Sequence, residues 1–180
     1  MNGELNPLHE QLFRPIPPIL HSFELEGPFT HCTVCGKDLK ASKSSYLIEK
    51  IISQGEVIAE YAICRDCMQP MREEVSEESK TKIQAFYKEN RKVWQDLSRC
   101  NFSLQPIDEL VSYKIVADCI GDRIFSLNHP TTISGVWHAK LSECVSELTR
   151  KNMEGYREKI FPDPPQVAKE LKEESFASLE

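Results

Sequence analysis

Two pairs of cysteines constrain the fold of this chain more than any other feature. Cys32 and Cys35 form one C-x-x-C pair, and Cys64 and Cys67 form a second. Each pair can present two thiolates from a tight backbone turn, and four thiolates match the tetrahedral coordination of Zn²⁺. We therefore predict one structural zinc ion bound by these four cysteines. Buried or redox-active thiols without a metal are the alternative interpretation.

His31 precedes the first pair and could replace a ligand. Four cysteines already complete a closed zinc site, so we interpret His31 as a surface residue or a neighbour of a ligand. The chain has seven cysteines, an odd number that excludes complete disulfide pairing within one chain.

The remaining sequence is typical of a globular protein in a reducing compartment. Of its 180 residues, 40% are hydrophobic and 28% charged, and no run of 18 apolar residues occurs. The first residues lack the basic and apolar blocks of a signal peptide. We therefore expect a cytoplasmic protein, in which cysteines stay reduced and can bind metal.

The residues between and after the cysteine pairs predict a hairpin followed by helices. Residues 45–52 and 57–63 have strand-like patterns on either side of a Ser-Gln-Gly turn, and a helix is expected to open at Cys67. Ser76 is a predicted N-cap for a second helix that ends near Asn90. A cysteine knuckle, a hairpin and a second pair at a helix start resemble the treble-clef zinc finger. This resemblance covers about residues 31–90 and implies a zinc module, not one function.

The second half repeats this pattern without its cysteine pairs. Residues 145–150 match residues 75–80 at an offset of 70, which makes Ser146 a second helix N-cap. Residues 112–115 match residues 45–48 at an offset of 67. We predict strands at 113–120 and 123–127 and helices at about 133–145 and 147–160.

Ser134-Gly135-Val136-Trp137 stands where the first half has its second cysteine pair. Trp137 would then provide apolar packing in place of the metal. A metal-free structural repeat is our prediction, and chance similarity between two helical hairpins is the alternative. The fold class is α+β, with a treble-clef-like module followed by this repeat.

The other cysteines and histidines could be proposed as a second metal site: Cys100, Cys119, Cys144, His129 and His138. None of these cysteines has C-x-x-C spacing, and Cys144 falls on an apolar helical stripe. We interpret the cysteines as buried free thiols, because free cysteine is among the most buried residue types.

Composition changes along the chain predict four regions: a proline-rich N-terminal arm (1–30), a four-cysteine zinc module (31–97), a metal-free second repeat (98–162) and an acidic C-terminal tail (163–180). Within the arm, Phe23 and Leu25 alternate with polar residues and predict one short strand. The arm is either a docking segment for a partner, or a strap packed on its own domain or a partly loose terminus. The tail either folds back or offers a surface to a partner.

The whole layout also resembles a group of bacterial zinc-finger proteins with a C-x-x-C front half and a metal-free second half. The matching residues are the four cysteines, the two serine caps, Ile133-Ser134-Gly135, and residues 161–165, which read FPDPP. The resemblance implies an architecture and no mechanism.

The sequence indicates no catalytic residues and no organic cofactor site. Residues 36–90 contain no histidine, and no glycine-rich phosphate loop occurs. We therefore expect a non-catalytic protein whose partner is another protein, with oligomeric state left open. A nucleic-acid-binding zinc finger is one alternative, supported by Lys37, Lys40 and Lys43 but opposed by the net charge of −6. A thiol-based redox switch that releases zinc is another.

Overall fold

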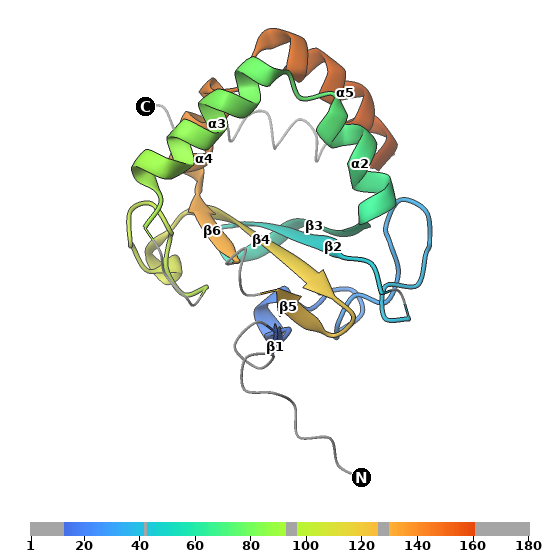
Figure 1. Ribbon diagram of the computed structural model, residues 1–180. Helices are drawn as coiled ribbons and strands as arrows, with labels where there is room; N and C mark the ends of the chain where they lie inside the picture. The colour runs from blue at the N-terminus through green and yellow to red at the C-terminus, as the bar shows by residue number, and fades with distance from the viewer. Residues whose placement is uncertain (1–12, 42, 93–96, 126–129, 161–180) are drawn as a thin grey trace.

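The computed structural model describes residues 13–41, 43–92, 97–125 and 130–160, with side chains described through residue 153. These residues form an α+β fold in which α-helices lie on one face of a six-stranded antiparallel sheet (Figure 1). The α+β class was predicted from the sequence.

Two long strands, one from each half of the chain, form the centre of the sheet. β2 (Tyr46–Ser53) and β4 (Ser112–Ile120) are rich in β-branched and aromatic residues and pair antiparallel, with Tyr46 opposite Cys119. β3 (Glu56–Cys64) pairs with β2 across a two-residue turn. Gln54 and Gly55 in this turn have φ values of 50° and 82°, as a type I′ hairpin requires.

Three short strands complete the sheet on the other side of β4. β5 (Arg123–Phe125) and β6 (Thr131–Ser134) both pair with β4, at opposite ends of it. β1 (Phe13–Pro15) pairs with β5. The strand order is therefore β1-β5-β4-β2-β3, with β6 beside β4, so β3 and β1 lie at opposite edges.

The helices form two hairpins of matching length. α2 (Arg65–Glu73) and α3 (Glu77–Asn90) follow β3, and α4 (Gly135–Glu143) and α5 (Glu147–Ile160) follow β6. The first helix begins two residues before the predicted start at Cys67.

Both predicted serine caps lie at the start of the second helix of a hairpin. The Ser76 hydroxyl accepts a hydrogen bond from the Ser79 amide (3.2 Å), and Ser146 accepts one from the Thr149 amide (3.3 Å). The four hydroxyl groups also meet each other. The Ser76–Ser146 and Ser79–Thr149 oxygen pairs are each 3.1 Å apart, so they join the two hairpins.

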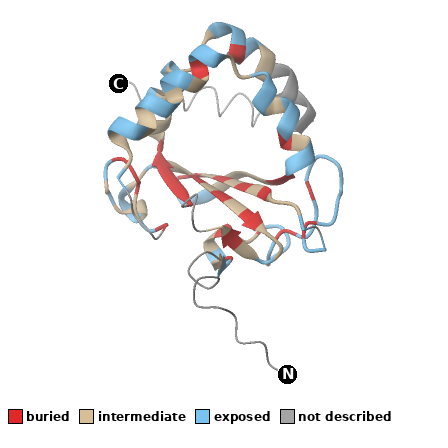
Figure 2. Ribbon diagram, viewed as in Figure 1, coloured by how far each residue is buried: buried red, intermediate tan, exposed pale blue. Residues whose placement is uncertain are grey.

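The main core lies on the sheet face away from the helices (Figure 2). There, alternate residues of the central strands, including Tyr46 and Ile48, pack against Leu20, Phe29 and Leu39 from the segment before β2. Two smaller clusters lie under the helices. The segment before β2 is therefore a packed layer within residues 13–41.

The strand predicted around Phe23 and Leu25 is wrong. Residues 22–27 form a tight turn, in which the Ser22 amide donates to the Gly27 carbonyl (2.7 Å). Glu26 has a φ of 49°, which is incompatible with a strand. Both Phe23 and Leu25 are exposed. The alternation of apolar and polar residues therefore does not mark a buried strand face.

Among the described helices, none is long and apolar enough to cross a bilayer. The acidic tail (163–180), the FPDPP segment, His129 and residues 1–12 of the arm lie outside the described residues.

Candidate metal centre

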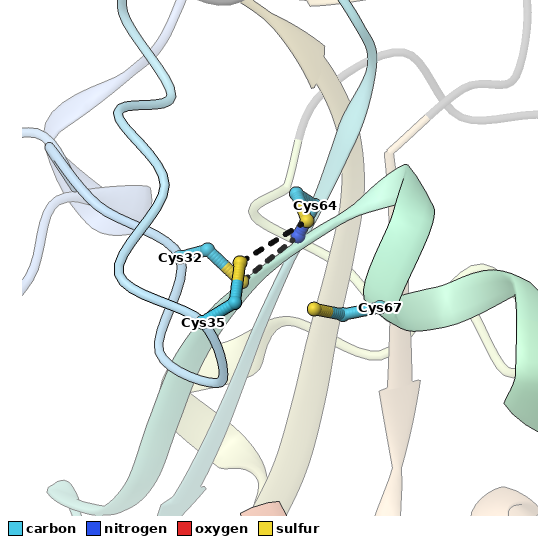
Figure 3. Close-up of side chains that lie close together, drawn as sticks. All are labelled: Cys32, Cys35, Cys64 and Cys67. Carbon is cyan, nitrogen blue, oxygen red and sulfur yellow. Dashed lines mark hydrogen bonds between the residues drawn. The ribbon is translucent and has the colours of Figure 1, made fainter.

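The structure brings the four cysteines of the two C-x-x-C pairs together. Their sulfur atoms all lie within 4.8 Å of one another, and the side chains converge from two segments (Figure 3). Cys32 and Cys35 come from a turn before β2. Cys64 ends β3, and Cys67 lies in the first turn of α2.

The first pair sits on a turn closed by two backbone hydrogen bonds. The Gly36 amide donates to the Cys32 carbonyl (2.9 Å), and the Cys32 amide donates to the Lys37 carbonyl (2.8 Å). Gly36 has a φ of 71°, a left-handed conformation that glycine adopts without a Cβ penalty. The Thr33 amide donates to Ala62 of β3 (2.8 Å), so the turn is fixed against the strand that carries the second pair.

The second pair is positioned by the junction of β3 and α2. Cys64 is the N-cap of α2, with extended backbone angles, and its amide donates to the Cys32 sulfur (3.4 Å). Cys67 is the third residue of the helix. The positive end of the helix dipole therefore faces the sulfur cluster and favours thiolates there.

The thiols strongly influence one another's pKa values. Burial acts to raise the pKa of Cys32, but the amides of Cys64, Cys35 and Val34 outweigh it and lower the pKa to about 7. Burial raises the pKa of Cys64 and, more strongly, that of Cys67, where neighbouring cysteines add to the effect. One thiolate thus forms readily, and its negative charge opposes the ionisation of the other thiols. A bound cation would offset this repulsion.

The cluster is enclosed on one side and open on the other. Cys32 and Cys64 are buried, Cys67 is half-buried and Cys35 is exposed. Near the exposed side, the Lys37 ammonium lies 2.9 Å from the Asp66 carboxylate. Four soft sulfur donors fit a metal ion such as zinc, and they leave no coordination position for water or substrate.

Among the described residues, no other cysteine or histidine belongs to this cluster. Cys100 and Cys119 are fully buried, whereas Cys144 is half-buried. His31 is exposed, and its Nδ1 lies 2.9 Å from the Thr30 hydroxyl. Within the described ranges, the four predicted cysteines are the group of potential ligands that comes together.

The turn at Cys100 has the same backbone hydrogen bonds as the turn at Cys32. The Leu104 amide donates to the Cys100 carbonyl (2.9 Å), and the Cys100 amide donates to Gln105 (2.9 Å). Leu104 has a φ of 64°, close to that of Gly36. The Ser134 amide donates to the Cys100 sulfur (3.4 Å), as the Cys64 amide does to the Cys32 sulfur.

The two helix starts also match. Ser134 is the N-cap of α4 with φ −66° and ψ 157°, the values found at Cys64. Trp137, like Cys67, is the third residue of its helix. It stacks on Phe102 with ring centroids 5.4 Å apart. A tryptophan therefore lies where the first half has one of its four clustered sulfur atoms.

One polar contact was not predicted from the sequence. The Glu60 carboxylate of β3 accepts hydrogen bonds from the Ser22 hydroxyl (2.7 Å) and the Phe23 amide (2.8 Å). It also lies 3.1 Å from the buried Lys50 ammonium, which donates to the His21 carbonyl (2.6 Å). These residues are far apart in sequence, and no local pattern connects them.

Comparison with protein-family models, with curated proteins and with solved structures finds no match to this chain.

Proposed function

We propose that this protein is a zinc-stabilised, non-catalytic protein-interaction module. Zinc is the metal that best fits four cysteine sulfurs within 4.8 Å of one another. A closed four-cysteine site has no position at which to activate water, so the metal would stabilise the fold and not carry a reaction.

We further propose that the first half is a treble-clef-like unit and that the second half is its metal-free copy. The knuckle at Cys32, the β2–β3 hairpin and α2 support the first part. The equal lengths of the helices, the matching turn at Cys100 and the matching caps at Cys64 and Ser134 support the second.

The observation that carries the interaction role is the turn formed by residues 22–27, here called the Phe23 turn. Phe23 is 76% exposed and Leu25 is 55% exposed, although both are large apolar residues. Exposed apolar groups held in a fixed position are typical of contact sites for another protein.

The Phe23 turn is held rigidly although its apolar side chains are exposed. Glu60 accepts from the Ser22 hydroxyl and the Phe23 amide, and its side chain is only 14% exposed. The Leu25 amide donates to the Ser22 hydroxyl (3.2 Å). A partner would therefore meet an ordered turn and avoid much of the entropy cost of fixing it.

The test is affinity capture from the source cell with the tagged full-length chain. We expect Phe23→Ser with Leu25→Ser to abolish capture of the specific partner. Val111→Ser, which changes a 73% exposed residue elsewhere, should leave capture unchanged. Equal capture by all three proteins would contradict the interaction role, and salt-sensitive binding of DNA or RNA would favour the nucleic-acid alternative.

A redox switch is a second candidate, favoured by one observation. The exposed Cys35 sulfur lies 3.7 Å from the Cys64 sulfur, so an oxidant could reach one thiol beside another. The test is metal content before and after mild peroxide, followed by a reductant. Unchanged zinc would exclude the switch and leave the structural role intact.

A further inference from the structure

The sheet face beneath the helices is less completely covered than the opposite face. On the face away from the helices, Ile48 of β2 and Ile115 of β4 are 0% exposed. On the helix-facing side, Ile51 and Val116 of the same two strands are only half-buried. α2 packs on β3, and α4 packs on β4 and β6, so these helices cover the two ends of the face. Its middle is therefore a partly covered apolar surface between the two helical hairpins.

Four residues in register cross the middle of this face from one edge to the other. Tyr61 of β3 lies opposite Glu49 of β2, Glu49 lies opposite Val116 of β4, and Val116 lies opposite Thr131 of β6. Neighbouring strands are about 4.8 Å apart, so three spacings give this row a length of about 14 Å. Glu49 also lies 2.8 Å from Lys114, and their side chains are 12% and 20% exposed. The two charges offset each other, so a segment that covers the row need not supply a counter-charge.

α3 ends at one end of the row. The Arg91 guanidinium, at the C-terminus of α3, donates to the Thr131 hydroxyl (2.7 Å). The proposed repeat relates α3 to α5 at an offset of 70, which makes Ile160 the counterpart of Asn90 and Thr131 the counterpart of Tyr61. In this correspondence α5 ends near Tyr61, at the other end of the row. Figure 1 shows α3 and α5 descending on opposite sides of the molecule, as this requires.

The chain continues for 20 residues after the end of α5. Residues 161–165 read FPDPP, and the prolines oppose continuation of the helix. After them, Val167, Ala168 and Leu171 recur at helical spacing, and residues 167–176 contain no proline. Ten residues of helix measure about 15 Å, which matches the length of about 14 Å found for the row.

We propose that the C-terminal tail, residues 161–180, docks across the helix-facing side of the sheet along this row, beneath the two hairpins. Residues 161–165 form the turn from α5 onto the sheet. A helix over residues 167–176 then places Val167 and Leu171 against Ile51 and Val116. The occupant of this face is thus the chain's own C-terminus, which follows directly from the helix that ends beside it.

Methyl NMR spectroscopy of the full chain, with isoleucine, leucine and valine methyl groups labelled, tests the position of the tail. We expect nuclear Overhauser cross-peaks from the methyl groups of Leu171 and Val167 to those of Ile51 and Val116. Hydrogen exchange tests its order, because amides in a docked helix open only when the helix leaves the sheet. The amides of residues 167–176 should exchange at least tenfold more slowly in the wild type than in the variant Leu171→Asp.

Two variants of the tail separate docking from a general effect of added charge. Leu171→Asp places a carboxylate against the apolar face, so it should lose both the cross-peaks and the slow exchange. Lys169→Asp introduces the same side chain on the far side of the expected helix and should retain both. Zinc content should be equal in the two variants and the wild type, because the four cysteines belong to other segments of the chain.

Tail amides that exchange in the wild type at the rate of an unstructured peptide would overturn the docking. Slow exchange with cross-peaks to methyl groups elsewhere, and none to Ile51 or Val116, would overturn the position. Either result leaves the proposed interaction role intact, since the Phe23 turn belongs to the segment packed on the opposite face of the sheet. Conversely, a Phe23 turn that captures no partner would leave the cross-peaks of the tail unchanged.

Discussion

A second zinc site should appear when the missing ligands are supplied to the second half of the chain. Cys100 already occupies the position of Cys32, by its turn and by the amide that donates to its sulfur. The change is Ser103→Cys, Ser134→Cys and Trp137→Cys, at the positions that correspond to the other three ligands. If the second half is a metal-free copy, four sulfurs should then converge as they do in the first half.

The expected change in stability follows from the packing that the triple variant loses and the metal binding that it gains. Trp137 stacks on Phe102 and lies 6.0 Å from the ring of Phe86, so its loss should cost about 3 kcal/mol. Structural zinc contributes roughly 10–16 kcal/mol of apparent binding energy in small modules. The triple variant should therefore be less stable than wild type without zinc and more stable with it.

Metal analysis and thermal unfolding check both parts. We expect two zinc ions per chain in place of one. With the second site empty, the melting temperature should lie about 6–12 °C below that of wild type, since 1 kcal/mol is worth roughly 2–4 °C at this chain length. Adding Cys100→Ala to the triple variant is the matched control and should remove the second ion. A folded triple variant that binds one zinc would refute the proposed correspondence.

The remaining predictions concern the chain as it is. Cys35→Ser should lose zinc and destabilise the first half, whereas Cys119→Ser should keep its zinc; metal analysis distinguishes them. Zinc affinity should rise with pH by about two or more log units per pH unit near neutrality. The reason is that at least two thiols with a raised pKa, Cys64 and Cys67, must release protons when the metal binds, and competition with a chelator measures the affinity. Glu60→Gln should cost about 3 kcal/mol at pH 7 because it leaves Lys50 buried without its carboxylate. The pKa of Glu60 is lowered in the folded protein, so the ionised carboxylate stabilises the fold above the unfolded pKa of about 4.3, and this stabilisation is lost as the pH falls below it. The loss of stability caused by Glu60→Gln should therefore be smaller at pH 3 than at pH 7 when both are measured by denaturant unfolding. Thr149→Val should cost about 1–2 kcal/mol by removing an oxygen that accepts from a backbone amide across the two hairpins, and equal stability by denaturant unfolding would contradict this role.

Sequence patterns predicted the parts of this fold that depend on neighbouring residues. The C-x-x-C spacing, the Gly55 turn and the Ser76 cap each need only a few adjacent residues, and each is found near its expected position. The start of the first helix was misplaced by two residues because its N-cap is Cys64, a residue type outside the usual capping set.

Contacts between distant segments were not predictable in this way. The pairing of β2 with β4 joins the two halves into one sheet, and neither strand contains a local signal for its partner. The Phe23 segment was misread because alternation was taken to mean burial. Its side chains alternate while remaining exposed, and the residue that fixes the turn, Glu60, lies 37 positions away.

The matching turns at Cys32 and Cys100 have different surroundings, and this difference bears on the role that a metal would have at the proposed zinc site. Val34, in the middle of the first turn, is 41% exposed, whereas Phe102 at the corresponding place is 1% exposed. Phe102 packs against Trp137, Phe86 and Tyr87, so an aromatic cluster fills the second half where the first half gathers sulfur atoms. If apolar packing can replace the metal in an otherwise matching frame, the metal's contribution in the first half is structural. A reaction at the ion itself would need an open coordination position, and a closed set of four sulfurs gives a substrate no such position at the metal.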